Sequence, residues 1–87
     1  MEFYRIVVSI SSTDSLLTLN EFTKQLGFEK PVDLGIGKFT SVTDFDQPMF
    51  FNTRIPYGLE VKGYYINGDG DSVEYHPFGE QHYAMDV

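Results

Sequence analysis

Hydrophobic and polar residues alternate over the first ten positions, and this alternation predicts a β-strand over residues 2–10. Successive side chains of a strand point to opposite faces, so two sets of residues form. These sets are Tyr4, Ile6, Val8 and Ile10 on one face, and Phe3, Arg5, Val7 and Ser9 on the other. Because both sets include apolar residues, we expect this strand to lie centrally in a sheet, with some cover on each side.

The pattern then changes to helical spacing. Apolar residues recur three or four positions apart, at Leu16, Leu19, Phe22 and Leu26. Residues 11–14 are all types that favour a helix N-cap, and Gly27 stands where a left-handed C-terminal cap is expected. Together these signals predict one helix over residues 14–26.

From residue 38 onward the sequence favours strands and shows no second helix. We predict β segments at 38–44, 48–54, 58–66 and 72–77, and a loop at 33–37. Pro56-Tyr57-Gly58 predicts a turn between the second and third segments, and Asn67-Gly68 with Asp69-Gly70 predicts a hairpin between the third and fourth.

Alternation in the last two segments predicts which side chains face the core. The expected inward residues are Leu59, Val61, Gly63, Tyr65, Val73 and Tyr75, and the expected outward residues are Glu60, Lys62, Tyr64, Ile66, Ser72, Glu74 and His76. The sequence as a whole predicts a single small α+β domain over residues 1–87. Its order is one N-terminal strand, one helix, then an antiparallel β meander (β-α-β-β-β-β) packed on the helix.

Charge is distributed unevenly along the chain. The 13 acidic residues outnumber the 6 basic ones, and the formal net charge is -7. Residues 1–43 carry five acids and four bases (net -1), whereas residues 44–87 carry eight acids and two bases (net -6). This balance disfavours direct binding to nucleic acid or to an anionic membrane surface, because both need a basic face. It favours a basic partner instead.

Several chemistries are excluded or disfavoured by residue types and spacing. The chain has no cysteine, so it has no disulfide, thiolate zinc site or cysteine nucleophile. The N-terminal residues lack the basic and apolar segments typical of a signal peptide, and the sequence has no apolar run of about 20 residues. We expect a cytoplasmic protein, in a bacterial host cell if phage-encoded. The segment 35–40 (GIGKFT) does not match the Gly and Ser/Thr spacing of a phosphate-binding loop.

Candidate metal-binding and acid–base residues are better explained by structural roles in turns and at strand ends. The segment 67–71 (NGDGD) resembles the start of a calcium loop, but the Gly and Glu that should follow are missing. His76, Glu80 and His82 could bind a metal only if the tail folds back. The carboxylate pairs Asp44/Asp46 and Asp69/Asp71 stand in predicted turns or strand ends exposed to solvent. We expect no enzyme activity, no cofactor and no metal.

The outward residues of the last hairpin form the candidate site. Carboxylates and an aromatic side chain are predicted to share one surface, made of Glu60, Tyr64, Asp69, Asp71 and Glu74. Carboxylates would pair with Arg and Lys of a partner, and a tyrosine adds contact area at little entropic cost. The alternative interpretation of the same residues is a solvated sheet face that binds nothing.

We therefore hypothesise a non-enzymatic protein inhibitor whose acidic half occupies the positive groove of a nucleic-acid-binding protein. In size, charge and aromatic content the chain is similar to phage anti-defence proteins, including anti-CRISPR inhibitors, and to nuclease immunity proteins. The similarity is one of composition over the whole chain, is carried by no motif, and assigns no residue roles. The alternative hypothesis is a small interaction module that recruits a second copy through a sheet edge, giving a homodimer rather than a monomer.

Overall fold

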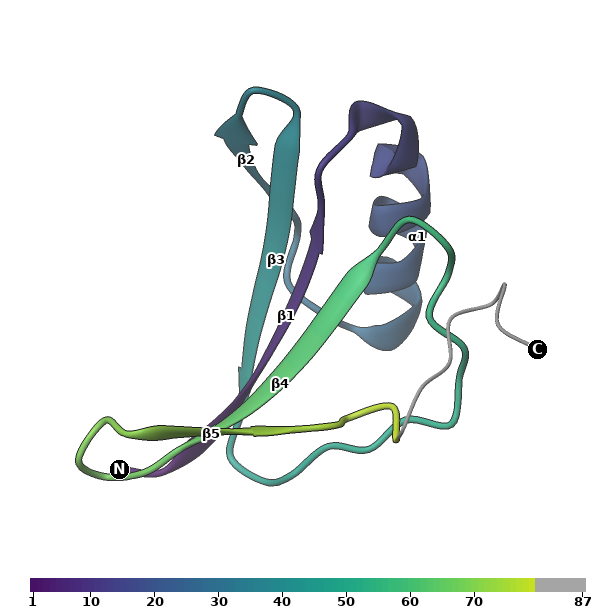
Figure 1. Cartoon of the computed structure of the whole chain (residues 1–87). Coiled ribbons are helices and arrows are strands. Elements are labelled where there is room, and N and C mark those ends of the chain that lie inside the picture. Colours follow the sequence, from purple (N-terminus) through teal and green to yellow (C-terminus); the bar gives the residue numbers. More distant parts are fainter. Residues whose placement is uncertain (80–87) are drawn as a thin grey trace.

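A computed structural model describes residues 1–79 and confirms the predicted small α+β domain. One helix packs against a single twisted antiparallel sheet (Figure 1). In chain order, the elements are β1 (Phe3–Ile10), the 3-10 turn η1 (Thr13–Ser15), α1 (Leu16–Leu26), β2 (Val32–Gly35), β3 (Lys38–Phe45), β4 (Glu60–Ile66) and β5 (Ser72–Tyr75).

The strand β1 occupies the centre of the sheet, as its two apolar faces predict. The spatial order is β2-β3-β1-β4-β5, and β1 is antiparallel to both of its neighbours. Arg5, for example, lies opposite Asp44 of β3 on one side and Tyr64 of β4 on the other. The helix covers one face of this sheet. Within residues 1–79 no helix covers the opposite face, which we call the open face (Figure 1).

The core lies between the sheet and α1. Alternate residues of β1 point into it, together with Leu19 and Phe22 from the helix. Aromatic rings fill the rest of the space, with Phe51 stacked on Phe78 at 5.0 Å between ring centroids and Phe28 edge-on to Phe51 at 5.4 Å. The complete set of buried apolar residues is Ile6, Val8, Ile10, Leu19, Phe22, Phe28, Ile55, Leu59 and Phe78.

Both predicted helix signals are present. The Ser12 hydroxyl accepts a hydrogen bond from the Asp14 amide at 3.2 Å, and η1 leads directly into α1. At the other end Gly27 adopts a left-handed conformation with φ of 75°. The Phe28 amide donates to the Thr23 carbonyl at 2.8 Å, so the chain turns back and buries Phe28 in the core.

Two predicted segments are wrong in detail. Residues 33–37 were expected to be a loop, but Val32–Gly35 pairs with β3 as an edge strand and only the Gly35-Ile36-Gly37 turn is irregular. The predicted strand at 48–54 is not a strand. The predicted and observed numbers of strands within residues 1–79 are therefore equal, but the predicted strand 48–54 is absent and the observed strand β2 was not predicted.

Topology explains why residues 48–54 cannot pair. β3 and β4 flank β1 and are both antiparallel to it, so they run parallel to each other. The chain must therefore return along the full length of the sheet from the end of β3 to the start of β4. Residues 46–59 make this crossover beside α1 (Figure 1), where Phe51 and Ile55 pack into the core.

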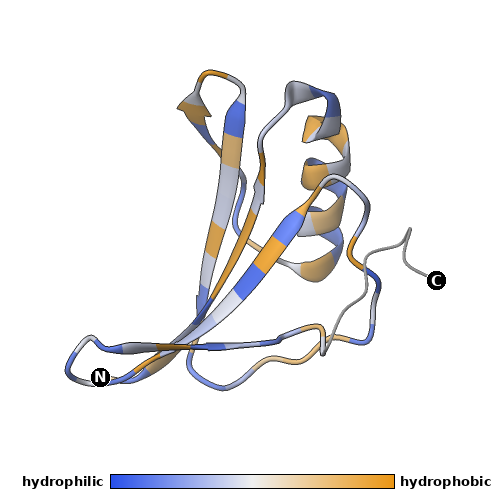
Figure 2. Cartoon of the chain, in the orientation of Figure 1, coloured by the Kyte–Doolittle hydropathy of each residue, from blue (hydrophilic) through white to orange (hydrophobic). Residues whose placement is uncertain are grey.

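The turns that flank β4 match their predictions. The Leu59 amide donates to the Pro56 carbonyl at 3.2 Å, and Gly58 has the positive φ that the turn requires, 96°. The β4–β5 hairpin also forms. Val61 and Gly63 of β4 pair with the inward residues Val8 and Ile6, as expected, and hydrophobic and hydrophilic residues alternate along the first part of the strand (Figure 2). Val73 shares the helix side of the sheet with Tyr65 but is 64% exposed, because β5 extends past the core. None of the helices within residues 1–79 has the length and apolar character needed to cross a bilayer.

Candidate interaction surface

Carboxylates gather at one end of the sheet. β1 begins at the end where β3 and β4 finish, as the pairs Tyr4–Phe45 and Phe3–Ile66 show. The N-terminus also lies beside the β4–β5 turn (Figure 1), where a Cβ on Gly68 would be 3.5 Å from the Met1 nitrogen. We define the acidic end as the carboxylates brought together here: Glu2, Asp44, Asp46, Asp69, Asp71 and Glu74.

Hydrogen bonds to Asn67 hold the hairpin that presents two of these carboxylates. The Asn67 side-chain oxygen accepts from the Asp69 amide at 2.9 Å and from the Asp71 amide at 3.0 Å. The Gly70 amide donates to the Asn67 carbonyl at 3.0 Å. Asn67 thus closes the turn, and both aspartates remain exposed at its tip.

Arg5 is the basic side chain that the strand register places among these carboxylates. A row of side chains crosses the open face from β3 to β5, in the order Asp44, Arg5, Tyr64, Glu74. Arg5 donates two hydrogen bonds to Asp44, Nε to Oδ1 at 2.7 Å and Nη2 to Oδ2 at 3.0 Å. These bonds raise the pKa of Arg5 above its ordinary value. Arg5 is therefore paired with Asp44, whereas Glu74, on the far side of Tyr64, forms no ion pair within residues 1–79.

Four of the five predicted site residues lie at the acidic end. Tyr64 and Glu74 are direct cross-strand neighbours, and Asp69 and Asp71 form the adjoining turn. Glu60 lies elsewhere, at the start of β4 opposite Ser9. It is separated from the turn by the length of β4, about 20 Å for seven residues, and Lys62 stands between them on the same face.

The sequence reasoning did not include Glu2, Asp44 or Asp46 in the surface. These residues are distant in sequence from the hairpin and reach it only through the pairing of β1 with β3 and β4. The central position of β1 was predictable, but its pairing partners were not. Only the observed register of β1 with β3 and β4 places Glu2, Asp44 and Asp46 at the end of the sheet where the hairpin lies.

An aromatic cluster borders the acidic end on the helix side of the sheet. The Tyr4 ring lies 5.1 Å from Tyr65 and 5.8 Å from Tyr75, and Phe50 meets Tyr75 edge-on at 5.7 Å. Burial raises the pKa of Tyr75, whose hydroxyl donates to the Met49 carbonyl at 3.3 Å. Desolvation, and secondarily a hydrogen bond with Glu2, raises the pKa of Tyr65. Phe50 is 69% exposed, so part of this cluster is open to a partner.

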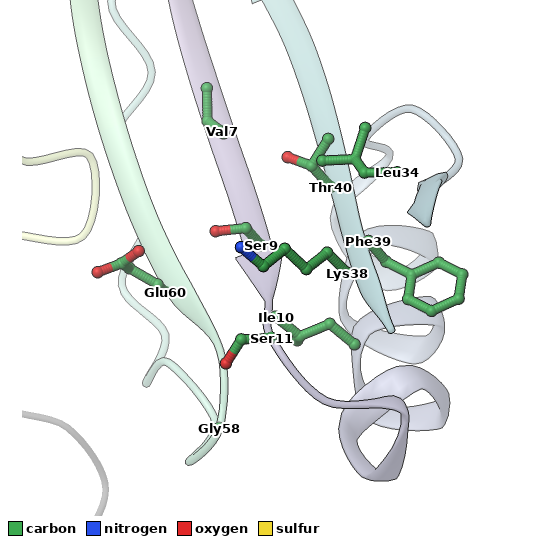
Figure 3. A pocket seen from close by; sticks show the side chains of 10 residues that line it. All are labelled: Val7, Ser9, Ile10, Ser11, Leu34, Lys38, Phe39, Thr40, Gly58 and Glu60. Carbon is green, nitrogen blue, oxygen red and sulfur yellow. The ribbon is translucent and has the colours of Figure 1, made fainter. Parts of the chain in front are cut away.

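A second feature lies at the opposite end of the open face. A shallow depression of about 430 Å³ is lined by Ser9, Lys38, Thr40 and Glu60, with Val7 and Leu34 beside them (Figure 3). Figure 3 shows the Lys38 side chain extending toward Ser9, with Glu60 on the neighbouring strand. A further depression of about 510 Å³ shares Thr40 with the first and continues to Val32 and Val42.

Metal-binding chemistry finds no support within the described residues. No group of three histidine or carboxylate side chains comes together in residues 1–79. His76 follows β5 in an exposed position, and the other members of the sequence candidate, Glu80 and His82, lie outside the described residues.

No protein-family model, curated protein or solved structure matches the chain.

Proposed function

We propose that the protein is a non-enzymatic inhibitor that binds a basic, nucleic-acid-binding surface of a partner protein through its acidic end. The observation that carries the proposal is the gathering of six carboxylates from three separate parts of the chain (residue 2, residues 44–46 and residues 69–74) at one end of the sheet, where Arg5 pairs with one of them. A groove that holds phosphates attracts such an array through the same electrostatic field.

The aromatic cluster next to the acidic end supports the same function. Protein interfaces are enriched in tyrosine and phenylalanine, and fixed rings contribute contact area while losing little conformational freedom. Tyr4, Tyr65 and Tyr75 already hold each other by ring contacts. Arginine side chains of a basic partner can pack on such rings while their charges pair with Asp69, Asp71 or Glu2.

The alternative, assembly through a sheet edge, gains little from the structure. Both edge strands, β2 and β5, are only four residues long. Pro31 precedes β2, a register shift interrupts its pairing with β3, and Pro77 follows close after β5. Short strands, prolines and bulges are the features by which proteins block edge-to-edge pairing.

Competition with DNA is the direct test of the inhibitor. The protein is immobilised, basic proteins are captured from a bacterial lysate at about 0.1 M salt, and a double-stranded oligonucleotide is added as competitor. We expect the oligonucleotide to release the captured protein, because both ligands occupy the same groove. A captured protein that binds DNA and inhibitor simultaneously would contradict the proposed mode of inhibition.

Two variants with the same net charge test whether partner binding depends on the acidic end or on the net charge of the whole protein. One variant carries Asp69→Asn, Asp71→Asn and Glu74→Gln at the acidic end, and the matched control carries Asp14→Asn, Glu21→Gln and Glu29→Gln elsewhere. Each lowers the negative charge by three, and all six residues are exposed. We expect the first variant to lose capture and the control to retain it. Equal loss in both would mean that net charge, and not the acidic end, binds the partner.

A further inference from the structure

The aromatic cluster of Tyr4, Tyr65, Tyr75 and Phe50 lies on a part of the sheet that the helix does not cover. β4 and β5 continue past the end of α1 (Figure 1), and none of the four rings belongs to the buried core of residues 1–79. Phe50 is 69% exposed, and Val73, the cross-strand neighbour of Tyr65, is 64% exposed. The cluster therefore presents ring surface to solvent.

Contacts within the fold hold these rings in position. Neighbouring rings of the cluster lie between 5.1 and 5.8 Å apart, measured between centroids. The Tyr75 hydroxyl donates to the Met49 carbonyl, and the Phe51 amide donates to the Pro77 carbonyl at 2.7 Å. These bonds fasten the segment that carries Phe50 to β5 and to the chain that follows it. A surface fixed in this way loses little conformational entropy when a partner binds.

The charge beside the cluster is negative. Glu2 forms a hydrogen bond with Tyr65 at one end of the cluster, and Asp71 stands exposed immediately before β5. Arg5 follows Tyr4 in β1 and so projects from the opposite, open face, where it is held in an ion pair. The charge next to these rings therefore complements a cation and not an anion.

A ring surface with adjacent negative charge fits arginine better than lysine. The guanidinium group is planar and weakly hydrated, so it can lie flat on an aromatic face while its N–H groups reach a carboxylate. The ammonium group of lysine is compact and strongly hydrated, and it loses more hydration on contact with a ring. The fold itself includes a contact of the first kind, in which the Arg5 guanidinium lies 5.2 Å from the centre of the Phe3 ring.

We propose that the aromatic cluster is the part of the interface that selects arginine, with guanidinium groups of the partner stacked on its rings and one of them paired with Glu2. The inference rests on the proposed inhibitor function and deepens it, because it names the side chain that the basic partner presents. Carboxylates attract arginine and lysine alike at long range, whereas the rings distinguish the two on contact.

Two synthetic peptides of equal length and charge test this selection, one alternating arginine with glycine and the other alternating lysine with glycine. NMR titration of the full chain gives both dissociation constants. We expect the arginine peptide to bind about threefold more tightly or better, the effect of a guanidinium group on an exposed ring. The ring protons of the cluster should also show nuclear Overhauser contacts to the arginine side chains.

A matched pair of variants locates the preference. Phe50→Leu removes the most exposed ring of the cluster, and Tyr57→Leu removes a ring that is 71% exposed in the turn before β4. Phe50→Leu should weaken binding of the arginine peptide by about two- to fivefold and affect the lysine peptide less, so that the preference falls. Tyr57→Leu should keep the preference of the wild type. Glu2→Gln should weaken binding of the arginine peptide by about twofold or more.

Equal affinities of the wild-type chain for the two peptides overturn the proposal, as does an unchanged preference in Phe50→Leu. Ring contacts to a second copy or to residues 80–87 that persist when the arginine peptide is added would also overturn it. Equal affinities leave the inhibitor function intact, since carboxylates alone can bind a basic groove. A captured protein that binds DNA and inhibitor simultaneously would instead contradict the function and leave the measured peptide preference unchanged.

Discussion

Two buried polar side chains on the inward face of β3 form hydrogen bonds with the backbone that follows the helix. Ser41 is fully buried, and its hydroxyl donates to the Glu29 carbonyl at 2.7 Å. The Glu29 amide in turn donates to the Thr43 hydroxyl at 2.9 Å. These two bonds satisfy the carbonyl and the amide of Glu29, which lies between α1 and β2 and belongs to neither element.

Tyr75 predicts how stability depends on alkaline pH. Because burial raises its pKa, the neutral form is favoured in the folded state, and the stability this group contributes is complete below about pH 10. It is lost as the pH rises through the raised pKa. We expect the contribution of Tyr75 to the thermal midpoint to be complete at about pH 9 and to decrease as the pH rises above about 10, so that Tyr75→Phe shows a smaller fall.

Thermal unfolding followed by circular dichroism at each pH measures this difference. At the lower pH, Tyr75→Phe should already be less stable by about 0.5–1.5 kcal/mol, because the hydrogen bond to the Met49 carbonyl is missing. Tyr57→Phe is the control, since Tyr57 is exposed. Identical pH profiles for wild type and Tyr75→Phe would exclude Tyr75 as a source of the alkaline transition.

Close packing between β4 and the segment after β5 requires glycine at position 63, because a larger residue would not fit there without a shift. Gly63 is buried opposite Ile6 in the sheet. A Cβ at this position would lie 2.7 Å from a Pro77 ring carbon and 2.9 Å from the Tyr75 ring. The close approach of these rings lets Tyr75 reach the Met49 carbonyl and joins β5 to the crossover segment.

Gly63→Ala should therefore destabilise the fold by about 1–3 kcal/mol, because a buried ring must move to make room. Gly68→Ala is the matched control: its φ is not positive, and the nearest atom to the added Cβ is 3.5 Å away. Urea denaturation of both variants measures the two changes in unfolding free energy. An equally small effect in both would show that Pro77 and Tyr75 adjust freely.

At the scale of the whole molecule, the acidic end lies at one end of the sheet. Exposed apolar residues reach the same region, since Val42 is 41% exposed and lies two residues from Asp44 on the open face. The carboxylates at this end are suited to long-range electrostatic attraction.

Long-range attraction predicts a specific kinetic response to salt. We expect the association rate constant with the captured basic protein to fall steeply between about 0.1 and 0.5 M salt, while the dissociation rate changes much less. Surface plasmon resonance measures both rates. The control Asp14→Asn/Glu21→Gln/Glu29→Gln should keep most of the salt dependence, and the acidic-end variant should lose it. A salt effect confined to dissociation would argue against electrostatic steering.

Local signals in the sequence were sufficient for the helix, its Ser12 and Gly27 ends, the central β1, and the β4–β5 hairpin. Each of these depends on contacts between residues close in sequence, or on a simple period of two or 3.6 residues. The part of the candidate site formed by Tyr64, Asp69, Asp71 and Glu74 was predictable for the same reason, because one hairpin holds all four.

Pairing between distant segments was decided only in three dimensions. Residues 48–54 have strand-like composition, but the parallel relation of β3 and β4 requires them as a crossover. Glu60 shares a strand with Tyr64, yet it lies at the other end of the sheet. Glu2 and Asp46 join the acidic end because register, and not sequence distance, determines which strand ends meet.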